Sequence, residues 1–320
     1  MSCWKHRTLT RRRLTTSAGA GLAGLALVGC GDDTPSGTAA PSGSPAASGS
    51  AAGSPGAATP KKGGELHLSL GVPTSQTLDP HKTLNLGFSY YGLFLGRVIS
   101  ADRQKIIPIQ PELVESWEQV DKTTYTFKVR QGVTWHEGKT GGGRALTADD
   151  IAFNLMRISG KLDPSRAALY QRATNLAGME KAEATDPSTV KITFSSPNSG
   201  FLAGVGDWRN WGVAREQVDK DPDFKDIKNL AGTGPFIIDS WDQTTLAGKY
   251  VANPKYWRAG FPYLASVQQT SLTDTAATQA AFFSGKIDYL GTISQEVRQE
   301  VQKNRSDARL NEYENLQWDY

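Results

Sequence analysis

The chain has 320 residues, with 35 lysines and arginines against 32 aspartates and glutamates, for a formal net charge of +3. Five of the positive charges lie in the first 29 residues, so the remainder carries about +3 − 5 = −2, which argues against a basic nucleic-acid-binding surface. The two cysteines, Cys3 and Cys30, are too few for a disulfide framework or a zinc site built on thiolates.

The first 29 residues are predicted to be a signal peptide. A basic head without acids, from Lys5 to Arg13, precedes an apolar run, Ala18 to Gly29. That run is shorter than the ~20 residues that span a bilayer, but it suits a signal-peptide core. Leu27-Val28-Gly29-Cys30 resembles a bacterial lipobox, in which the peptide is cut before the cysteine and the cysteine is lipidated. We therefore expect Cys30 to carry lipid and the protein to be exported and membrane-anchored, on the outer face of the cytoplasmic membrane or in the periplasm.

The export route has two readings. Thr10-Arg11-Arg12-Arg13-Leu14 resembles a twin-arginine motif, although Thr15 stands where a second apolar residue is usual. A basic head for the general secretion route explains the same residues, so both routes stay open.

Residues 31–59 are built from Gly, Ala, Ser, Thr and Pro apart from Asp32 and Asp33. Nothing there can offset the entropy of ordering the backbone. We predict a disordered, lipid-anchored linker over residues 30–62 that holds the body, residues 63–320, off the membrane.

Strands and helices are both expected in the body. Apolar residues alternate with polar ones at Leu66, Leu68 and Leu70, and again over 125–129 and 190–194, as in half-buried strands. Thr147 followed by Asp150 is a helix-start pattern, and Ile151, Leu155 and Ile158 recur on one face behind it. A second helix is expected over 276–283, ending at Gly285. Strands and helices alternate without a regular beat, which favours a mixed α/β (α+β) fold over a barrel.

Several motifs that suggest chemistry are better explained by structure. Gly138-Lys139-Thr140 lacks the spacing of a phosphate loop, because Val133 occupies the required glycine position, so an extended surface loop is expected. His67, His81 and His136 lie too far apart for ligand spacing, so we expect no metal and no cofactor, and a hydrogen-bonded structural role for His136. Asp149 and Asp150 fall in a helix's first turn, where capping explains them better than catalysis. No nucleophile-elbow pattern occurs, and the chain is not expected to be an enzyme.

An ordered set of segments resembles the family 5 extracellular solute-binding proteins, the peptide and nickel receptors of ABC importers. The segments are Thr77-Leu-Asp-Pro-His81, Pro111-Glu-Leu-Val-Glu-Ser-Trp117, Tyr125–Val133 with Trp135-His-Glu-Gly138, Leu146–Asp150, Gly232-Thr-Gly-Pro-Phe236, Asn253–Trp257 and Ser284–Asp288. The resemblance implies a periplasmic-binding-protein-like fold of two lobes, class II type. The chain departs from the family pattern at a Gly-rich insertion, Lys139 to Arg144. The resemblance also implies that the chain is C-terminally truncated, with the second lobe largely missing, so we expect it to bind ligand poorly.

The resemblance also suggests where ligand binds. It implies that Thr83, Leu84, Asn85, Leu86, Gly87 and Phe88, together with Trp208 and Trp211, face the cleft between the lobes. Aromatic side chains there suit varied ligands, although ordinary core packing explains each one equally well. Trp117, Trp241 and Trp257 are expected in the core.

The function implied is capture of oligopeptides or a similar small solute by a monomeric lipoprotein, for import through an ABC permease with its ATPase subunits. Hinge closure around the ligand is the implied mechanism. Nickel chelates, sugars and opines remain open as ligands. Two alternatives are a secreted, membrane-tethered hydrolase and a solute sensor that is not coupled to transport.

Overall fold

The computed structural model describes residues 60–70, 78–82, 95–101, 109–207, 210–291 and 293–310, with no side-chain description for 99–101. The predicted signal peptide, Cys30 and the linker up to residue 59 lie outside these residues, as do Thr83 to Phe88 and Trp208. The body of the chain forms a compact unit from Ala58 onward.

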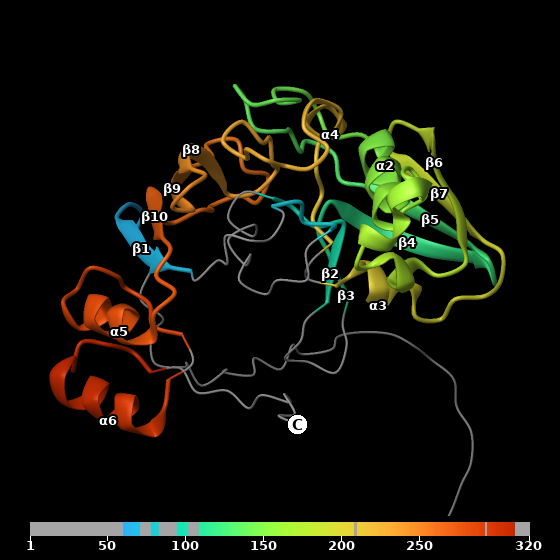
Figure 1. Ribbon diagram of the computed structural model, residues 1–320. Coiled ribbons are helices and arrows are strands. Elements are labelled where there is room, and N and C mark those ends of the chain that lie inside the picture. Colours follow the sequence, from blue (N-terminus) through green and yellow to red (C-terminus); the bar gives the residue numbers. More distant parts are fainter. Residues whose placement is uncertain are drawn as a thin grey trace, which may run out of the picture. The chain divides into compact units, whose positions relative to one another are not determined.

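One sheet forms around the alternating segment at 125–129. Its four antiparallel strands run in the order β4 (Val114–Asp121), β5 (Thr124–Val129), β7 (Thr189–Phe194) and β6 (Met179–Asp186) (Figure 1). In β5 the side chains of Tyr125, Phe127 and Val129 are buried, whereas Lys128 is exposed. The predicted period-two pattern therefore directs one face of this strand into the core.

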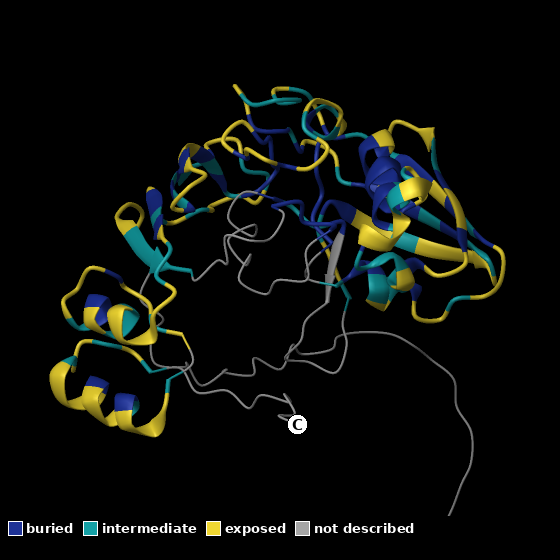
Figure 2. Ribbon diagram, in the orientation of Figure 1, coloured by how far each residue is buried: buried dark blue, intermediate teal, exposed yellow. Residues whose placement is uncertain are grey.

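Helix α2 (Ala148–Ile158) packs on strands β5, β6 and β7 of this sheet. Ile151, Leu155 and Ile158 are buried against it, as their spacing predicts, and Figure 2 shows α2 as a largely buried helix. Phe201, on the short helix α3 (Phe201–Val205), joins the same core, with its ring centroid 4.9 Å from that of Tyr125 and 4.8 Å from that of Phe194. Aromatic packing thus closes this core.

A second, mixed sheet has the order β1-β10-β9-β8. Strand β1 (Glu65–Ser69) pairs in parallel with β10 (Ser266–Thr270), and β9 (Ala247–Ala252) joins β10 to β8 (Phe236–Asp242) in antiparallel register. The strand predicted at Leu66 to Leu70 is confirmed, although its residues from Leu66 to Ser69 are all half-buried. Within the described ranges, β1 lies at the edge of the sheet and pairs with β10 on one side. Pairing with a strand 200 residues away fixes the start of the body.

The remaining described elements connect these two sheets or follow them. Strands β2 (Ile99–Ala101) and β3 (Ile109–Pro111) form an antiparallel pair. Helix α5 (Thr275–Phe283) begins at Asp274 and is followed by Gly285 at φ +73°, so the predicted helix and its glycine stop are confirmed. Helix α6 (Gln295–Asn304) packs with it around Phe282, Val297 and Val301. The other helices are η2 (Pro164–Leu169), η3 (Ala173–Leu176) and α4 (Arg215–Lys220).

The glycine-rich insertion differs from the expected extended surface loop. Thr140 N–H donates to the Asn229 carbonyl at 2.8 Å, and Gly142 N–H donates to the Lys139 carbonyl at 2.9 Å. A Cβ on Gly142 would stand 1.8 Å from the His136 carbonyl oxygen, so a glycine is required there. The insertion is a compact turn hydrogen-bonded to the segment before β8.

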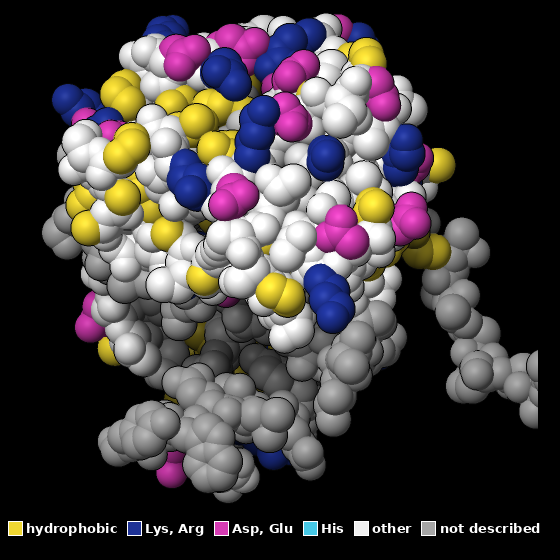
Figure 3. Space-filling model, turned by 90° about the vertical axis from the view of Figure 1, so that its right-hand side faces the viewer, with side chains coloured by type: hydrophobic (Ala, Val, Ile, Leu, Met, Phe, Trp, Pro, Cys, Tyr) yellow, Lys and Arg dark blue, Asp and Glu magenta, His cyan; other side chains and the backbone are white. Residues whose placement is uncertain are grey.

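None of the helices within the described ranges is both long enough and apolar enough to cross a bilayer. On the face shown in Figure 3, lysines and arginines alternate with aspartates and glutamates. Charges of the two signs are interspersed on that face rather than gathered by sign.

Candidate functional site

A buried ion pair joins the Leu-Asp-Pro-His motif to helix α2. Arg157 donates from Nη1 to Asp79 Oδ1 at 2.9 Å and from Nη2 to Asp79 Oδ2 at 2.5 Å. The Arg157 and Asp79 side chains are 2% and 0% exposed. Burial by itself raises the pKa of Asp79, but the charge and hydrogen bonds of Arg157 outweigh this effect and hold that pKa below its ordinary value. The pair is therefore charged and fixes the motif on the helix.

His81 extends this network to the tryptophan segment. Its Nδ1 accepts from Arg157 Nη1 at 2.6 Å, so its Nε2–H donates to the Trp211 carbonyl at 2.7 Å. Burial and the neighbouring Arg157 charge lower the pKa of His81 to about 3, so the ring is neutral at physiological pH. One imidazole thus links the motif that precedes Thr83 to the segment that follows Trp208.

Contacts with Gly96 and Arg97 hold Trp211 and the residue after it in place. The backbone of Trp211 forms an antiparallel bridge with Arg97, whose guanidinium lies 5.3 Å from the centroid of the indole ring. The next residue, Gly212, donates its N–H to the Gly96 carbonyl at 2.7 Å. Trp211 is 8% exposed and packs in the core beneath the second sheet. In this structure it is chiefly a core residue that fixes the course of the predicted ligand segment.

Asn154, on α2, is a second anchor for that segment. Its side-chain amide donates to the Val213 carbonyl at 2.9 Å, and its Oδ1 accepts from the Val213 N–H at 2.8 Å. Asn154 is 1% exposed, so the paired hydrogen bonds satisfy a polar group that would otherwise be costly to bury. Helix α2 thus holds Asp79, shortly before the first predicted ligand segment, and Val213, shortly after the second.

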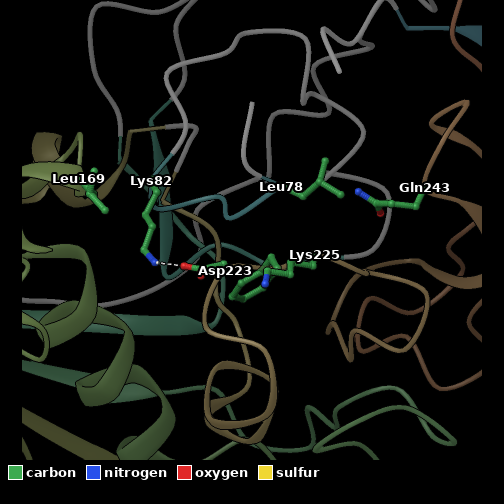
Figure 4. Close-up of a pocket in the computed structure, with 7 residues that line it drawn as sticks. Leu78, Lys82, Leu169, Asp223, Lys225 and Gln243 are labelled. Carbon is green, nitrogen blue, oxygen red and sulfur yellow. Dashed lines mark hydrogen bonds and ion pairs between the residues drawn. The ribbon is translucent and has the colours of Figure 1, made fainter. Parts of the chain in front are cut away.

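A pocket of about 440 Å³ opens beside Lys82, directly before the predicted ligand segment that starts at Thr83. Figure 4 shows Lys82 extended toward Asp223, with Leu78 and Gln243 on the opposite side. Lys82 Nζ lies 3.2 Å from Asp223 Oδ1 and donates to the Pro222 carbonyl at 3.0 Å. The other lining residues are Leu169, Phe224 and Lys225.

The lining of this pocket is of mixed character. Its seven residues combine apolar side chains with two lysines, one aspartate and one amide. Across the described ranges no group of three or more His, Cys, Asp or Glu side chains is arranged to hold a metal ion.

The predicted structural role of His136 is confirmed. Its Nε2–H donates to the Gly234 carbonyl at 3.0 Å, and its Nδ1 accepts from the Gly232 N–H at 3.2 Å. Burial lowers the pKa of His136 to about 4. The ring therefore holds the glycine-rich segment that leads into β8.

The capping role of Asp150 is confirmed as well. Its carboxylate accepts from the Thr147 N–H at 3.0 Å, as in a capping box. It also accepts from both Arg144 Nη atoms at 2.8 Å.

Among the tryptophans expected in the core, Trp241 is buried, whereas Trp117 and Trp257 are partly buried against the first core. Sequence reasoning missed Arg157 and Asn154, whose polar character hid their place on the buried face of α2.

The family described as bacterial extracellular solute-binding proteins, family 5 Middle, matches residues 108–320. The glutathione-binding protein GsiB of Escherichia coli (strain K12) is 31% identical over 241 residues, which are 72% of this chain and 43% of that protein. The chain therefore spans less than half the length of this relative.

Two solved structures are similar to this chain. MoaA of A. tumefaciens R10, in complex with mannopinic acid, has a TM-score of 0.61 at 28% identity, covering 76% of this chain and 48% of that one. DppA from Helicobacter pylori, in complex with the peptide STSA, has a TM-score of 0.65 at 22% identity, covering 76% and 49%, and shows the fold alone. The mixed α/β body thus has the fold of these periplasmic binding proteins. With more than half of its length matched to the family, the chain belongs to the family 5 bacterial extracellular solute-binding proteins.

Proposed function

We propose that this chain captures a small peptide or a similar amino-acid-derived solute outside the cell and delivers it to an ABC permease. The observation that carries the proposal is the family match over residues 108–320. The relatives at 28% identity or more add support, because one is a glutathione-binding protein and the other was solved in complex with mannopinic acid, both ligands built on amino acids. The chain acts as a binding protein and makes or breaks no bond.

The proposed ligand surface consists of Thr83 to Phe88 and Trp208, and the buried Trp211 fixes the course of the second segment. The support for it is the hydrogen-bonded path from Asp79 through Arg157 and His81 to Trp211, which ties residues shortly before Thr83 and shortly after Trp208 to one helix. In the pocket beside Lys82 the Lys82 ammonium is paired with Asp223, but Lys225 and Gln243 add an ammonium and an amide next to apolar walls. That combination suits a ligand with a carboxylate and short side chains.

Anchoring through Cys30 completes the proposal. It rests on the lipobox resemblance at Leu27 to Cys30 and on the linker composition of residues 31–59. The lipid keeps the captured solute near the permease in the membrane, where linkage raises the effective concentration.

Uptake by whole cells tests the proposal. In the organism that encodes the chain, deletion of its gene is expected to stop import of at least one labelled solute from a panel of glutathione, dipeptides, tripeptides and mannopinic acid. Reintroducing the wild-type gene restores import. A hydrolase would instead leave import intact and stop breakdown of a solute outside the cell, and a sensor would change gene expression with import intact.

Two tryptophan variants, Trp211→Ala and Trp208→Ala, separate stability from ligand binding. Because Trp211 is buried, truncation is expected to lower the free energy of unfolding by about 3–5 kcal/mol. Trp208→Ala is the companion variant, and we expect it to weaken solute binding more than it lowers the melting temperature. Unchanged affinity together with an equal loss of melting temperature would show that Trp208 is a packing residue.

A further inference from the structure

The linker reaches the body at an aromatic surface. Gly63 N–H donates to the Tyr263 carbonyl at 2.8 Å, and Ala265 N–H donates to the Gly64 carbonyl at 2.9 Å. The first residues of the body are thereby fixed beside the segment that leads into β10. A membrane anchor on the linker, residues 30–62, therefore keeps this end of the body closest to the membrane.

Two aromatic side chains are exposed at that point. Phe261 and Tyr263 are 49% and 38% exposed, and their ring centroids lie 4.8 Å apart. An apolar hollow of about 270 Å³ lies against them, lined also by Pro235, Phe236, Tyr256 and Leu264. Exposed single hydrophobic residues are ordinary on a protein surface, but two aromatic rings in contact, tilted by 54° to each other, beside an apolar hollow mark a contact surface.

Two lysines accompany the aromatic pair, since Lys61 and Lys62 are exposed directly before Gly63. The exposed Arg258 also lines the hollow, but its guanidinium is paired with Glu112 at 2.6 Å. Aromatic rings with lysines and arginines around them are the side chains that proteins place at membrane–water interfaces. Lysines next to an anionic bilayer are attracted to it within a Debye length. We call Lys61, Lys62, Phe261, Pro262 and Tyr263 the exit face.

The linker is short enough to hold this surface near the membrane. A flexible chain of about 30 Gly-, Ala- and Ser-rich residues has an end-to-end distance on the order of 30 Å. At that distance the local concentration of lipid around the exit face is high, so even weak affinity for lipid fills the surface.

We propose that the exit face rests on the anionic phospholipid surface to which Cys30 anchors the chain, with Phe261 and Tyr263 among the headgroups and Lys61 and Lys62 against lipid phosphates. This inference rests on the proposed lipid anchor. It adds an orientation of the body relative to the membrane, because the body is held both by its linker and by the contact of the exit face with lipid.

Spin-label accessibility tests the orientation. The chain's cysteines are at positions 3 and 30, so after signal cleavage and acylation one engineered cysteine is labelled uniquely. Ala259→Cys places a nitroxide on an exposed residue beside the exit face, and Val120→Cys, at an exposed site on β4, is the matched control. The acylated protein is reconstituted in vesicles of phosphatidylcholine with phosphatidylglycerol and, separately, of phosphatidylcholine alone.

In the anionic vesicles we expect a severalfold drop in accessibility to a water-soluble nickel reagent at position 259 and no drop at position 120. Phe261→Ser with Tyr263→Ser, or Lys61→Gln with Lys62→Gln, is expected to restore accessibility at 259. Equal accessibility at both sites overturns the proposal. Shielding of position 259 that appears on concentrating the protein without lipid also overturns it, since a second copy would then be the occupant.

Acylation is measured independently with a labelled fatty acid, so failure of the anchor is distinguishable from failure of the exit face. If Cys30 carries no lipid, the exported chain is added to the same vesicles from solution. The Lys61→Gln, Lys62→Gln pair is then expected to weaken binding about 30-fold. Binding unaffected by either pair of substitutions overturns the proposal in that case.

Discussion

At the scale of single residues, the buried histidines make the stability of the body sensitive to acid. His136 has its pKa lowered to about 4 by burial, against an ordinary value of 6.5. The unfolded chain therefore binds a proton between these values while the folded chain does not. Stability is full above about pH 6.5 and is lost as the pH falls toward 4, and His81 acts in the same direction.

His136→Gln tests this dependence. The glutamine amide can donate to the Gly234 carbonyl and accept from the Gly232 N–H, but it does not titrate. Between pH 6.5 and 4, wild type is expected to lose about 3 kcal/mol more free energy of unfolding than the variant. Urea denaturation across that pH range measures the difference. If the free energy of unfolding of the two proteins changes equally with pH, His136 is not the cause of the pH dependence.

The Asp79–Arg157 pair gives a second prediction. Arg157→Met removes the two-point contact with the buried Asp79 carboxylate, leaving Lys82 Nζ at 3.5 Å, and is expected to cost about 3–5 kcal/mol in the free energy of unfolding. The double change Asp79→Leu, Arg157→Met removes both charges, so it should cost clearly less than the sum of the single changes. Chemical denaturation of the four proteins measures the coupling. Additive losses would mean that the two side chains are not coupled through the ion pair.

At the scale of elements, Arg144 joins the glycine-rich turn to two helices. Its guanidinium contacts Asp150 on α2 and Glu216 on α4, with Nε 2.7 Å from Glu216 Oε1. These two carboxylates differ in environment, since the Asp150 side chain is 5% exposed and that of Glu216 is 43% exposed. Hydrogen bonds to both acids raise the pKa of Arg144, with Asp150 the larger contributor.

A matched pair of substitutions uses this contrast. Asp150→Asn weakens the helix cap and the buried half of the contact, and is expected to lower the free energy of unfolding by about 1–3 kcal/mol. Glu216→Gln changes a solvent-screened pair and is expected to cost about 1 kcal/mol or less. Thermal denaturation of both variants, in low and high salt, gives the comparison. A larger loss for Glu216→Gln would contradict the assigned roles.

At the scale of the whole molecule, the anchor is the feature to test. Cys30→Ala removes the only sulfur that the predicted lipobox can acylate. We expect no labelled fatty acid in this variant and its loss from the membrane fraction, with wild type as the control. Fatty acid that still enters the Cys30→Ala protein would contradict lipidation at this residue.

Local periodicity predicted much of the fold. The strands at 125–129 and 190–194, the helix behind Thr147 and the glycine stop at 285 follow from alternation, from 3.6-residue spacing and from capping chemistry, which act over a few neighbours. Ordered motifs predicted the family. Thr83 to Phe88, Trp208, Cys30 and the linker remain predictions, since the described residues do not include them.

The tertiary structure decided what depends on residues distant in the chain. The parallel pairing of β1 with β10, the compact turn at 139–144 and the charge network from Asp79 to Trp211 join segments 76 to 201 residues apart, and no local pattern encodes such contacts. Arg157 and Asn154 are polar, yet both are buried. A polar side chain enters a core when partners distant in the chain satisfy its hydrogen bonds. The sequence by itself determined the elements and the family and predicted an export signal, whereas three-dimensional packing decided how Trp211 is held and which strand lies beside the start of the body.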